Sequence, residues 1–156
     1  MYEVLTQQVS DFDCIVPVPL SPDKQKKGQP NRTRILAQAL GALLRVTVAD
    51  VLSLSGAISK RQFLSAALTQ AQFEHQYRQL LNVDTSIRRY PRILLLDDVC
   101  TEGSTLNSAL QRIRETHPQS QLSATTAGQM ILKSVVKDER LILGETPPML
   151  FTDVGR

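Results

Sequence analysis

The chain has 156 residues and a mass of 17.4 kDa, the length of one ordinary globular domain with a full hydrophobic core. Its 18 Lys and Arg residues against 15 Asp and Glu residues give a net charge of +3, which is too small for a protein that coats nucleic acid. No stretch approaches the ~18 apolar residues of a membrane span, and residues 1–13 resemble no secretion signal. Two cysteines, Cys14 and Cys100, lack the spacing of a zinc site or a disulfide framework. We therefore expect one domain over residues 1–156, located in the cytoplasm.

The first predicted element is a strand at 14–18 (CIVPV), which is β-branched, apolar and interrupted by proline. A basic loop follows, and Asn31 is the expected N-cap of a helix of three to four turns. The predicted apolar face of this helix consists of Ile35, Leu36, Ala39, Leu40, Leu43 and Leu44. Residues 46–54 (VTVADVLSL) predict a second strand, and the polar segment SGAISKRQ predicts an exposed loop.

A second amphipathic helix is predicted through 67–81, and the apolar run 92–96 predicts a parallel strand that is buried on both faces. The apolar residues of the second helix are expected to be Leu64, Leu68, Ala71 and Leu80 or Leu81, and those of a third helix Leu106, Ala109, Leu110 and Ile113. Later apolar runs lie at 122–126 and 130–136, and the tail from Gly144 reads as irregular. Alternating strands and helices predict an α/β domain with a mainly parallel central sheet flanked by helices.

The most informative stretch is 93–105, ILLLDDVCTEGST, in which two adjacent acids follow a buried strand. Ligands of α/β sheets bind at the carboxyl ends of strands, where Asp97 and Asp98 are expected. The small and hydroxyl residues that follow would begin a helix, whose N-terminal N–H groups favour an anion. A phosphate cup beside two carboxylates suits a ribose 5-phosphate, because carboxylates accept hydrogen bonds from a vicinal diol.

The same residues also fit a plain strand-to-helix loop, with Asp97 capping the turn, Asp98 solvated and Ser104 as the N-cap of the helix. The functional interpretation, a site for a phosphorylated ribose, is favoured because the apolar run, the two acids and the small and hydroxyl residues all occur in this order. Two other phosphate-binding motifs are excluded, because the chain contains neither GxxxxGK[ST] nor a GxGxxG that follows a strand.

This stretch resembles the phosphoribosyl-pyrophosphate (PRPP) signature of type I phosphoribosyltransferases across thirteen positions. The resemblance implies that fold, and it implies that Asp97 and Asp98 hold the ribose hydroxyls and contact Mg2+ indirectly, through ribose or water. It assigns the 5-phosphate to Thr101, Gly103, Ser104 and Thr105. Glu102 departs from the family pattern, which more often has a small or hydroxyl residue there.

Within that family, IVPVPLSPDKQKKGQPNRTRILAQAL is similar to the competence-associated ComF-type branch, with Lys27, Gly28 and Asn31 in matching places. By resemblance, the loop that contains Lys27 and Gly28 contacts the pyrophosphate. A loop rich in lysine also fits a simply solvated segment. The N-terminal zinc ribbon that many ComF-type proteins carry has no counterpart in this sequence.

The segment SGAISKRQ would correspond to the flexible catalytic loop, which makes Lys60 and Arg61 the expected catalytic residues; two solvated charges are the alternative. Phe73 and His75 stand approximately where the branch has an Arg and an Asn. The resemblance implies Mg2+-dependent transfer of 5-phosphoribosyl from PRPP to a nucleobase-like nitrogen with release of pyrophosphate. The alternative is a regulatory PRPP- or nucleotide-binding module that acts through a protein partner. Homodimers are common among the proteins that it resembles, so a homodimer is a further expectation. We expect no membrane partner. Direct nucleic-acid binding ranks last among the functions considered.

Overall fold

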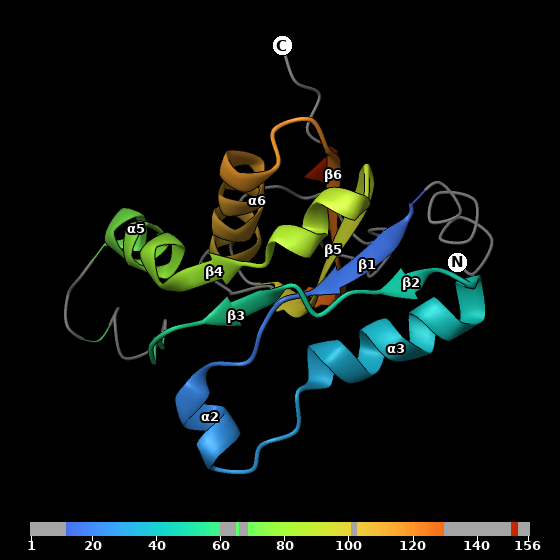
Figure 1. Cartoon of the computed structure of the whole chain (residues 1–156). Coiled ribbons are helices and arrows are strands. Elements are labelled where there is room, and N and C mark those ends of the chain that lie inside the picture. Colours follow the sequence, from blue (N-terminus) through green and yellow to red (C-terminus); the bar gives the residue numbers. More distant parts are fainter. Residues whose placement is uncertain (1–11, 60–64, 66–68, 101–102, 130–150, 153–156) are drawn as a thin grey trace, which may run out of the picture.

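A five-stranded sheet forms the centre of the computed structural model, which describes residues 12–59, 65, 69–100, 103–129 and 151–152 (Figure 1). The strand order is β2-β1-β5-β6-β7. The strands are β1 (Cys14–Pro17), β2 (Thr47–Val48), β5 (Arg92–Cys100), β6 (Gln121–Gln129) and β7 (Phe151–Thr152). β1 pairs in parallel with β2 and β5, β5 pairs in parallel with β6, and β7 is antiparallel to β6. The prediction of a mainly parallel central sheet with flanking helices is confirmed.

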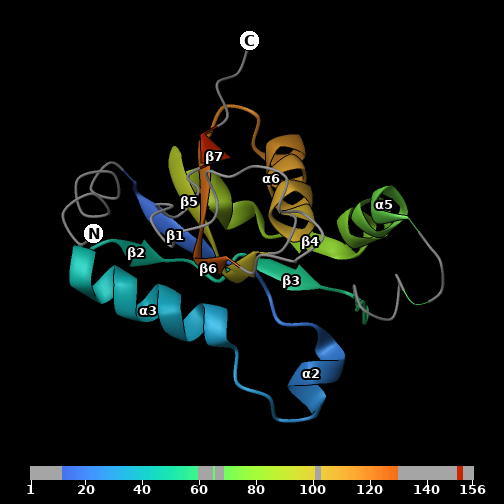
Figure 2. The ribbon, with the colours of Figure 1, turned by 180° about the vertical axis from the view of Figure 1, so that it is seen from behind.

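Helices cover both faces of this sheet, as Figures 1 and 2 show from opposite sides. α3 (Arg32–Leu44) packs on one face, and α6 (Ser104–Thr116) lies on the other with α5 (Gln70–Leu80) against it. The short helices are α2 (Pro22–Lys26) and η1 (Thr85–Arg89). β3 (Leu52–Leu54) and β4 (Leu81–Val83) form a separate antiparallel pair. None of the helices in the described ranges combines the length and apolar composition that a membrane crossing requires.

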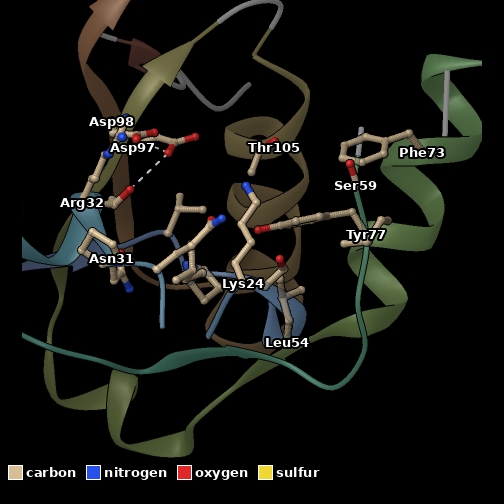
Figure 3. Close-up of a pocket in the computed structure, with 18 residues that line it drawn as sticks. Lys24, Asn31, Arg32, Leu54, Ser59, Phe73, Tyr77, Asp97, Asp98 and Thr105 are labelled. Atoms are coloured by element: carbon tan, nitrogen blue, oxygen red, sulfur yellow. Dashed lines mark hydrogen bonds between the residues drawn. The ribbon is translucent and has the colours of Figure 1, made fainter. Parts of the chain in front are cut away.

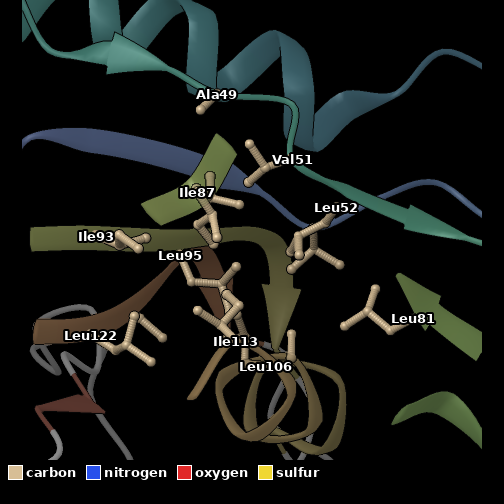
Figure 4. Packing of buried hydrophobic residues seen from close by; sticks show 14 of the residues in the cluster. Ala49, Val51, Leu52, Leu81, Ile87, Ile93, Leu95, Leu106, Ile113 and Leu122 are labelled. Atoms are coloured by element: carbon tan, nitrogen blue, oxygen red, sulfur yellow. The ribbon is translucent and has the colours of Figure 1, made fainter. Parts of the chain in front are cut away.

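β5 is buried on both faces, as its apolar sequence predicts. Ile93 and Leu95 pack in the larger cluster, which includes residues of α5, α6 and β6, whereas Leu94 and Leu96 pack with Ala37 of α3 (Figure 4 shows the larger cluster). Successive side chains of a strand point to opposite faces, so one run of four apolar residues joins two layers of core.

α3 has the predicted extent, but its predicted apolar face is confirmed only in part: Leu40 and Leu44 are partly buried against the core. Its buried residues are Thr33, Ala37 and Gly41, whereas Ile35 and Leu43 are 57% and 56% exposed. The helix approaches β2 and the residue before it, Val46, closely at Gly41. A Cβ atom on Gly41 would lie 2.6 Å from Val48 Cγ2, so only the strip of small residues allows this contact.

The prediction of one strand over 46–54 is wrong, because the chain changes partner in the middle of it. β2 pairs with β1, and directly after β2 the Ala49 N–H donates to the Ile15 carbonyl at 2.9 Å. β3 then pairs with β4, and the Asp84 N–H donates to the Val51 carbonyl at 2.8 Å. The only local signal for the break is Asp50, an exposed residue of a type depleted in strands, because apolar residues continue on both sides of it.

The tail prediction is wrong for two residues, because Phe151–Thr152 forms β7 beside Ser123 and Ala124 of β6. Backbone hydrogen bonding to an edge strand depends little on side-chain pattern, which explains why the prolines and glycines of the tail did not predict it. The apolar run 130–136 lies outside the described residues.

Candidate functional site

A cavity of about 670 Å³ lies beside the carboxyl ends of β1 and β5. The segment after β1, the start of α3, β3, the α5 helix, β5 and the first turn of α6 all contribute to its lining. Figure 3 shows Asp97 and Asp98 on one side and the aromatic side chains of α5 on the other. The cavity is therefore at the sheet edge where ligands of parallel α/β folds bind.

Both carboxylates of the acidic pair line this cavity, although the strand does not end before them. β5 continues alongside β6 to Cys100, whereas its pairing with β1 stops at Pro17 opposite Leu96. The cavity therefore lies beside the part of β5 that pairs with β6 but no longer with β1. Each acid accepts the next backbone N–H: Asp97 Oδ1 from Asp98 and Asp98 Oδ1 from Val99, both at 2.8 Å.

Asp97 has an unusual electrostatic environment. The pKa of Asp97 is raised to about 7, mainly because the carboxyl group is buried and also because of the neighbouring Asp98 carboxylate, whereas hydrogen bonds from the Asp98 N–H and from Thr33 limit the rise. The Thr33 hydroxyl, at the start of α3, lies 3.5 Å from Asp97 Oδ1. Both protonation states of Asp97 are consequently accessible near neutral pH, so it can accept hydrogen bonds from ligand hydroxyls once ionised.

The first turn of α6 lies beside the acidic pair. Gly103 is the N-cap, with a φ of 75°, a left-handed conformation that favours glycine. Ser104 is the first helical residue and is buried, and Thr105 lines the cavity. The expectation that Ser104 itself would be the N-cap is therefore wrong. Gly103 makes no side-chain hydrogen bond to cap α6, and the start of a helix is a place where an anion is favoured.

The basic loop after β1 folds into α2, and Lys24 on that helix lines the cavity. Arg32, the first residue of α3, also lines it, next to Asn31, whose side chain caps α3 by accepting from the Arg34 N–H at 3.0 Å. Lys27 and Gly28 are exposed and lie outside the cavity lining. Their contact with a ligand stays a prediction.

Three of the predicted site residues, Lys60, Arg61 and Thr101, lie outside the described residues, as does Glu102. Ser59, directly before the predicted catalytic pair, lines the cavity. The roles of Lys60, Arg61 and Thr101 stay predictions.

Two lining residues, Phe73 and Tyr77, were not predicted as part of the site. They are 2% and 4% exposed, one helical turn apart on α5, with ring centroids 5.8 Å from each other. The prediction for this helix emphasised Ala71, which is exposed. An i, i+4 aromatic pair in a helix rich in glutamine was the available signal, because such spacing places both rings on one face.

The Tyr77 hydroxyl is buried and has no hydrogen-bond partner within the described part of the chain. Burial raises the pKa of Tyr77 above its ordinary value, and the charge of Asp97 adds to the rise. The phenol therefore keeps its proton at neutral pH.

Comparisons with protein-family models, with curated proteins and with solved structures find no match for this chain. The fold and the cavity define an α/β protein with a cavity beside the carboxyl-terminal part of its parallel strands.

Proposed function

We propose that the chain is a PRPP-dependent phosphoribosyltransferase with a type I-like fold, which transfers 5-phosphoribosyl to a nucleobase-like nitrogen and releases pyrophosphate. The observation that carries the proposal is that Asp97, Asp98 and Thr105 of the PRPP-like stretch line one cavity together with two cations, Lys24 and Arg32. A ligand that combines a diol with phosphate and pyrophosphate groups requires this combination of acceptors, helix N-terminus and positive charge.

In this proposal Asp97 and Asp98 accept hydrogen bonds from the ribose hydroxyls. Gly103, Ser104 and Thr105, with Thr101, hold the 5-phosphate at the first turn of α6. The pyrophosphate is placed toward the basic loop, where the resemblance suggests Lys27 and Gly28. Lys24, which lines the cavity, supports the same placement, because its ammonium group can neutralise a polyanion there.

The residues present fit a magnesium ion that is held mainly by the ligand and by water. The described residues include no group of three or more His, Cys, Asp or Glu side chains arranged to hold a metal ion. Mg2+ typically binds one or two carboxylates together with substrate oxygens and water, which two adjacent aspartates at the cavity allow. When bound, the ion neutralises charge on the pyrophosphate.

The proposed reaction requires little covalent chemistry from the protein. The bond between ribose C1 and the pyrophosphate oxygen breaks, a bond between C1 and the acceptor nitrogen forms, and the proton of that nitrogen passes to the departing pyrophosphate or to solvent. Lys60 and Arg61, with the cations of the cavity, would stabilise the departing negative charge. The proposed reaction also requires that water be excluded from C1, because water would compete with the acceptor.

The first test is titration of the protein with PRPP and magnesium by isothermal calorimetry. We expect specific binding that the double variant Asp97→Asn with Asp98→Asn abolishes, because amides cannot replace two negative hydrogen-bond acceptors. Asp84→Asn is the matched control. Asp84 caps η1 by accepting from the Ser86 N–H and is not part of the cavity lining, and asparagine caps a helix equally well. Equal affinity of wild type and the double variant would refute the site assignment.

One observation favours a second function, a regulatory module that binds PRPP or a nucleotide without turnover. Phe73, which stands approximately where ComF-type proteins have a polar residue, is buried and lines the cavity, so this wall supplies no charge for catalysis. Release of pyrophosphate separates the two functions: an enzyme releases it with some base, whereas the module binds PRPP and releases none.

A further inference from the structure

The wall of the cavity opposite the carboxylates is apolar and aromatic. Leu54 of β3, Ile58, Phe73 and Tyr77 contribute to it, and in Figure 3 the α5 rings lie across the cavity from Asp97 and Asp98. A phosphoribosyl group has no apolar surface that would use this wall. A flat ring would, because it buries both its faces against apolar side chains and stacks favourably on aromatic ones.

The same wall holds a hydrogen-bonding group without a partner. The Tyr77 hydroxyl has none among the described residues, and in Figure 3 its oxygen end points away from α5 toward the middle of the lining residues. A buried hydroxyl without a partner is unfavourable. Since the phenol stays protonated, it can donate to an acceptor atom. The oxygen is buried in the free protein, so a ligand reaches it only after lining side chains move.

From this combination we infer that Phe73 and Tyr77 form the acceptor subsite, and that Tyr77 selects planar heterocycles that present a carbonyl oxygen or ring nitrogen to its hydroxyl. This inference rests on the proposed function, because it makes the ring the nucleophile that attacks the phosphoribosyl group at the carboxylate side. It adds a specificity-determining residue on α5 and defines the acceptor as a ring with a hydrogen-bond acceptor, rather than an amine or an aliphatic amide.

The test measures the affinity of adenine, hypoxanthine and uracil by calorimetry, with ribose 5-phosphate and magnesium present so that no turnover occurs. We expect at least one of these heterocycles to bind. Tyr77→Phe should lower the affinity for that heterocycle about tenfold, the usual effect of one lost hydrogen bond. The variant keeps the aromatic ring of the side chain, so the affinity for PRPP is expected to be unchanged. Its Tm is expected to be unchanged or higher, because a buried hydroxyl without a partner is removed.

Two further variants separate recognition from a structural effect. Tyr90→Phe is the matched control, because Tyr90 lies outside the cavity lining, and it is expected to change neither affinity. Phe73→Leu removes the aromatic face and is expected to weaken every ring that binds, while PRPP affinity is retained.

The inference is overturned if none of the rings binds, if Tyr77→Phe binds the rings as well as wild type does, or if it weakens PRPP and ring equally. A failure of the proposed function looks different. PRPP would then not bind to wild type at all, whereas the rings would still bind in a way that depends on Tyr77.

Discussion

Asp97 combines a buried carboxyl group with a place in the cavity lining. It faces the cavity in an environment that disfavours its charge, and burial raises its pKa to about 7. A ligand that donates hydroxyl hydrogen bonds, or a nearby cation, would offset that cost, because both favour the ionised carboxylate. A carboxyl group in a cavity whose pKa is raised by burial and by a neighbouring charge is typical of functional sites.

The pH dependence of stability should show this cost. The pKa of Asp97 is raised in the folded protein, so its contribution to stability is fully present below its unfolded value of 3.8 and is lost as pH rises through about 7. We expect Asp97→Asn to be more stable than wild type at pH 8, by at most about 4 kcal/mol, and the difference to shrink toward pH 4. Urea unfolding of both proteins at pH 4, 6 and 8 measures it. A difference that is constant across this range would contradict the raised pKa.

At the scale of elements, the close packing of α3 against β2 depends on one glycine. Gly41 lies in the middle of α3, where glycine normally costs about 1 kcal/mol relative to alanine. It is required there because a Cβ atom would lie 2.6 Å from Val48 Cγ2 and 2.8 Å from the Val46 carbonyl oxygen. The backbone oxygen cannot move as a side chain can. Because Arg32 and Thr33 at the start of α3 line the cavity, the position of α3 against the sheet determines where these two side chains lie.

Gly41→Ala should therefore destabilise the protein although alanine is the better helix former. Because a backbone oxygen is among the atoms that would clash, we expect a steric cost near the upper end of about 1–3 kcal/mol, which exceeds the gain in helix propensity of about 1 kcal/mol and leaves a net loss of up to about 2 kcal/mol in chemical unfolding. Ala42→Gly, at an exposed position of the same helix, is the control and should show the propensity term alone. A variant at Gly41 that is as stable as wild type would mean that α3 does not pack this closely.

At the scale of the whole molecule, the cavity connects parts of the chain that are far apart in the sequence. Ser21 and Lys24 follow β1, Tyr77 lies on α5, and Asp97 and Thr105 come from β5 and α6. A ligand that contacts all of them links both helical layers through the sheet. Binding should consequently stabilise the entire fold and not only a local loop.

A thermal unfolding series with magnesium and increasing PRPP tests this. At a ligand concentration 100 times the Kd, the gain is about 2.7 kcal/mol, which corresponds to a rise in Tm of roughly 5–10 °C for a chain of this size. The Asp97→Asn, Asp98→Asn double variant should show no rise, and magnesium alone should have little effect. An equal rise in the double variant would indicate that PRPP binds elsewhere.

Local patterns in the sequence determined much of the scaffold. The apolar run of β5, the Asn31 cap of α3 and the apolar residues Leu106, Ala109 and Ile113 of α6 all appear as predicted, because periodicity and capping depend on residues close in the chain. The acidic pair was placed at the correct edge of the sheet for the same reason, since β5 and the start of α6 are adjacent in sequence.

Only the tertiary structure decided which residues meet at the cavity. Packing between α3 and β2 selected the small face of α3, and the exchange of pairing partners divided 46–54 into two strands. Lys24 rather than Lys27 lines the cavity, and Phe73 and Tyr77 face the carboxylates from α5. These relations join residues distant in sequence, and they depend on volume, close contact and pairing geometry, which no local pattern of residue types encodes.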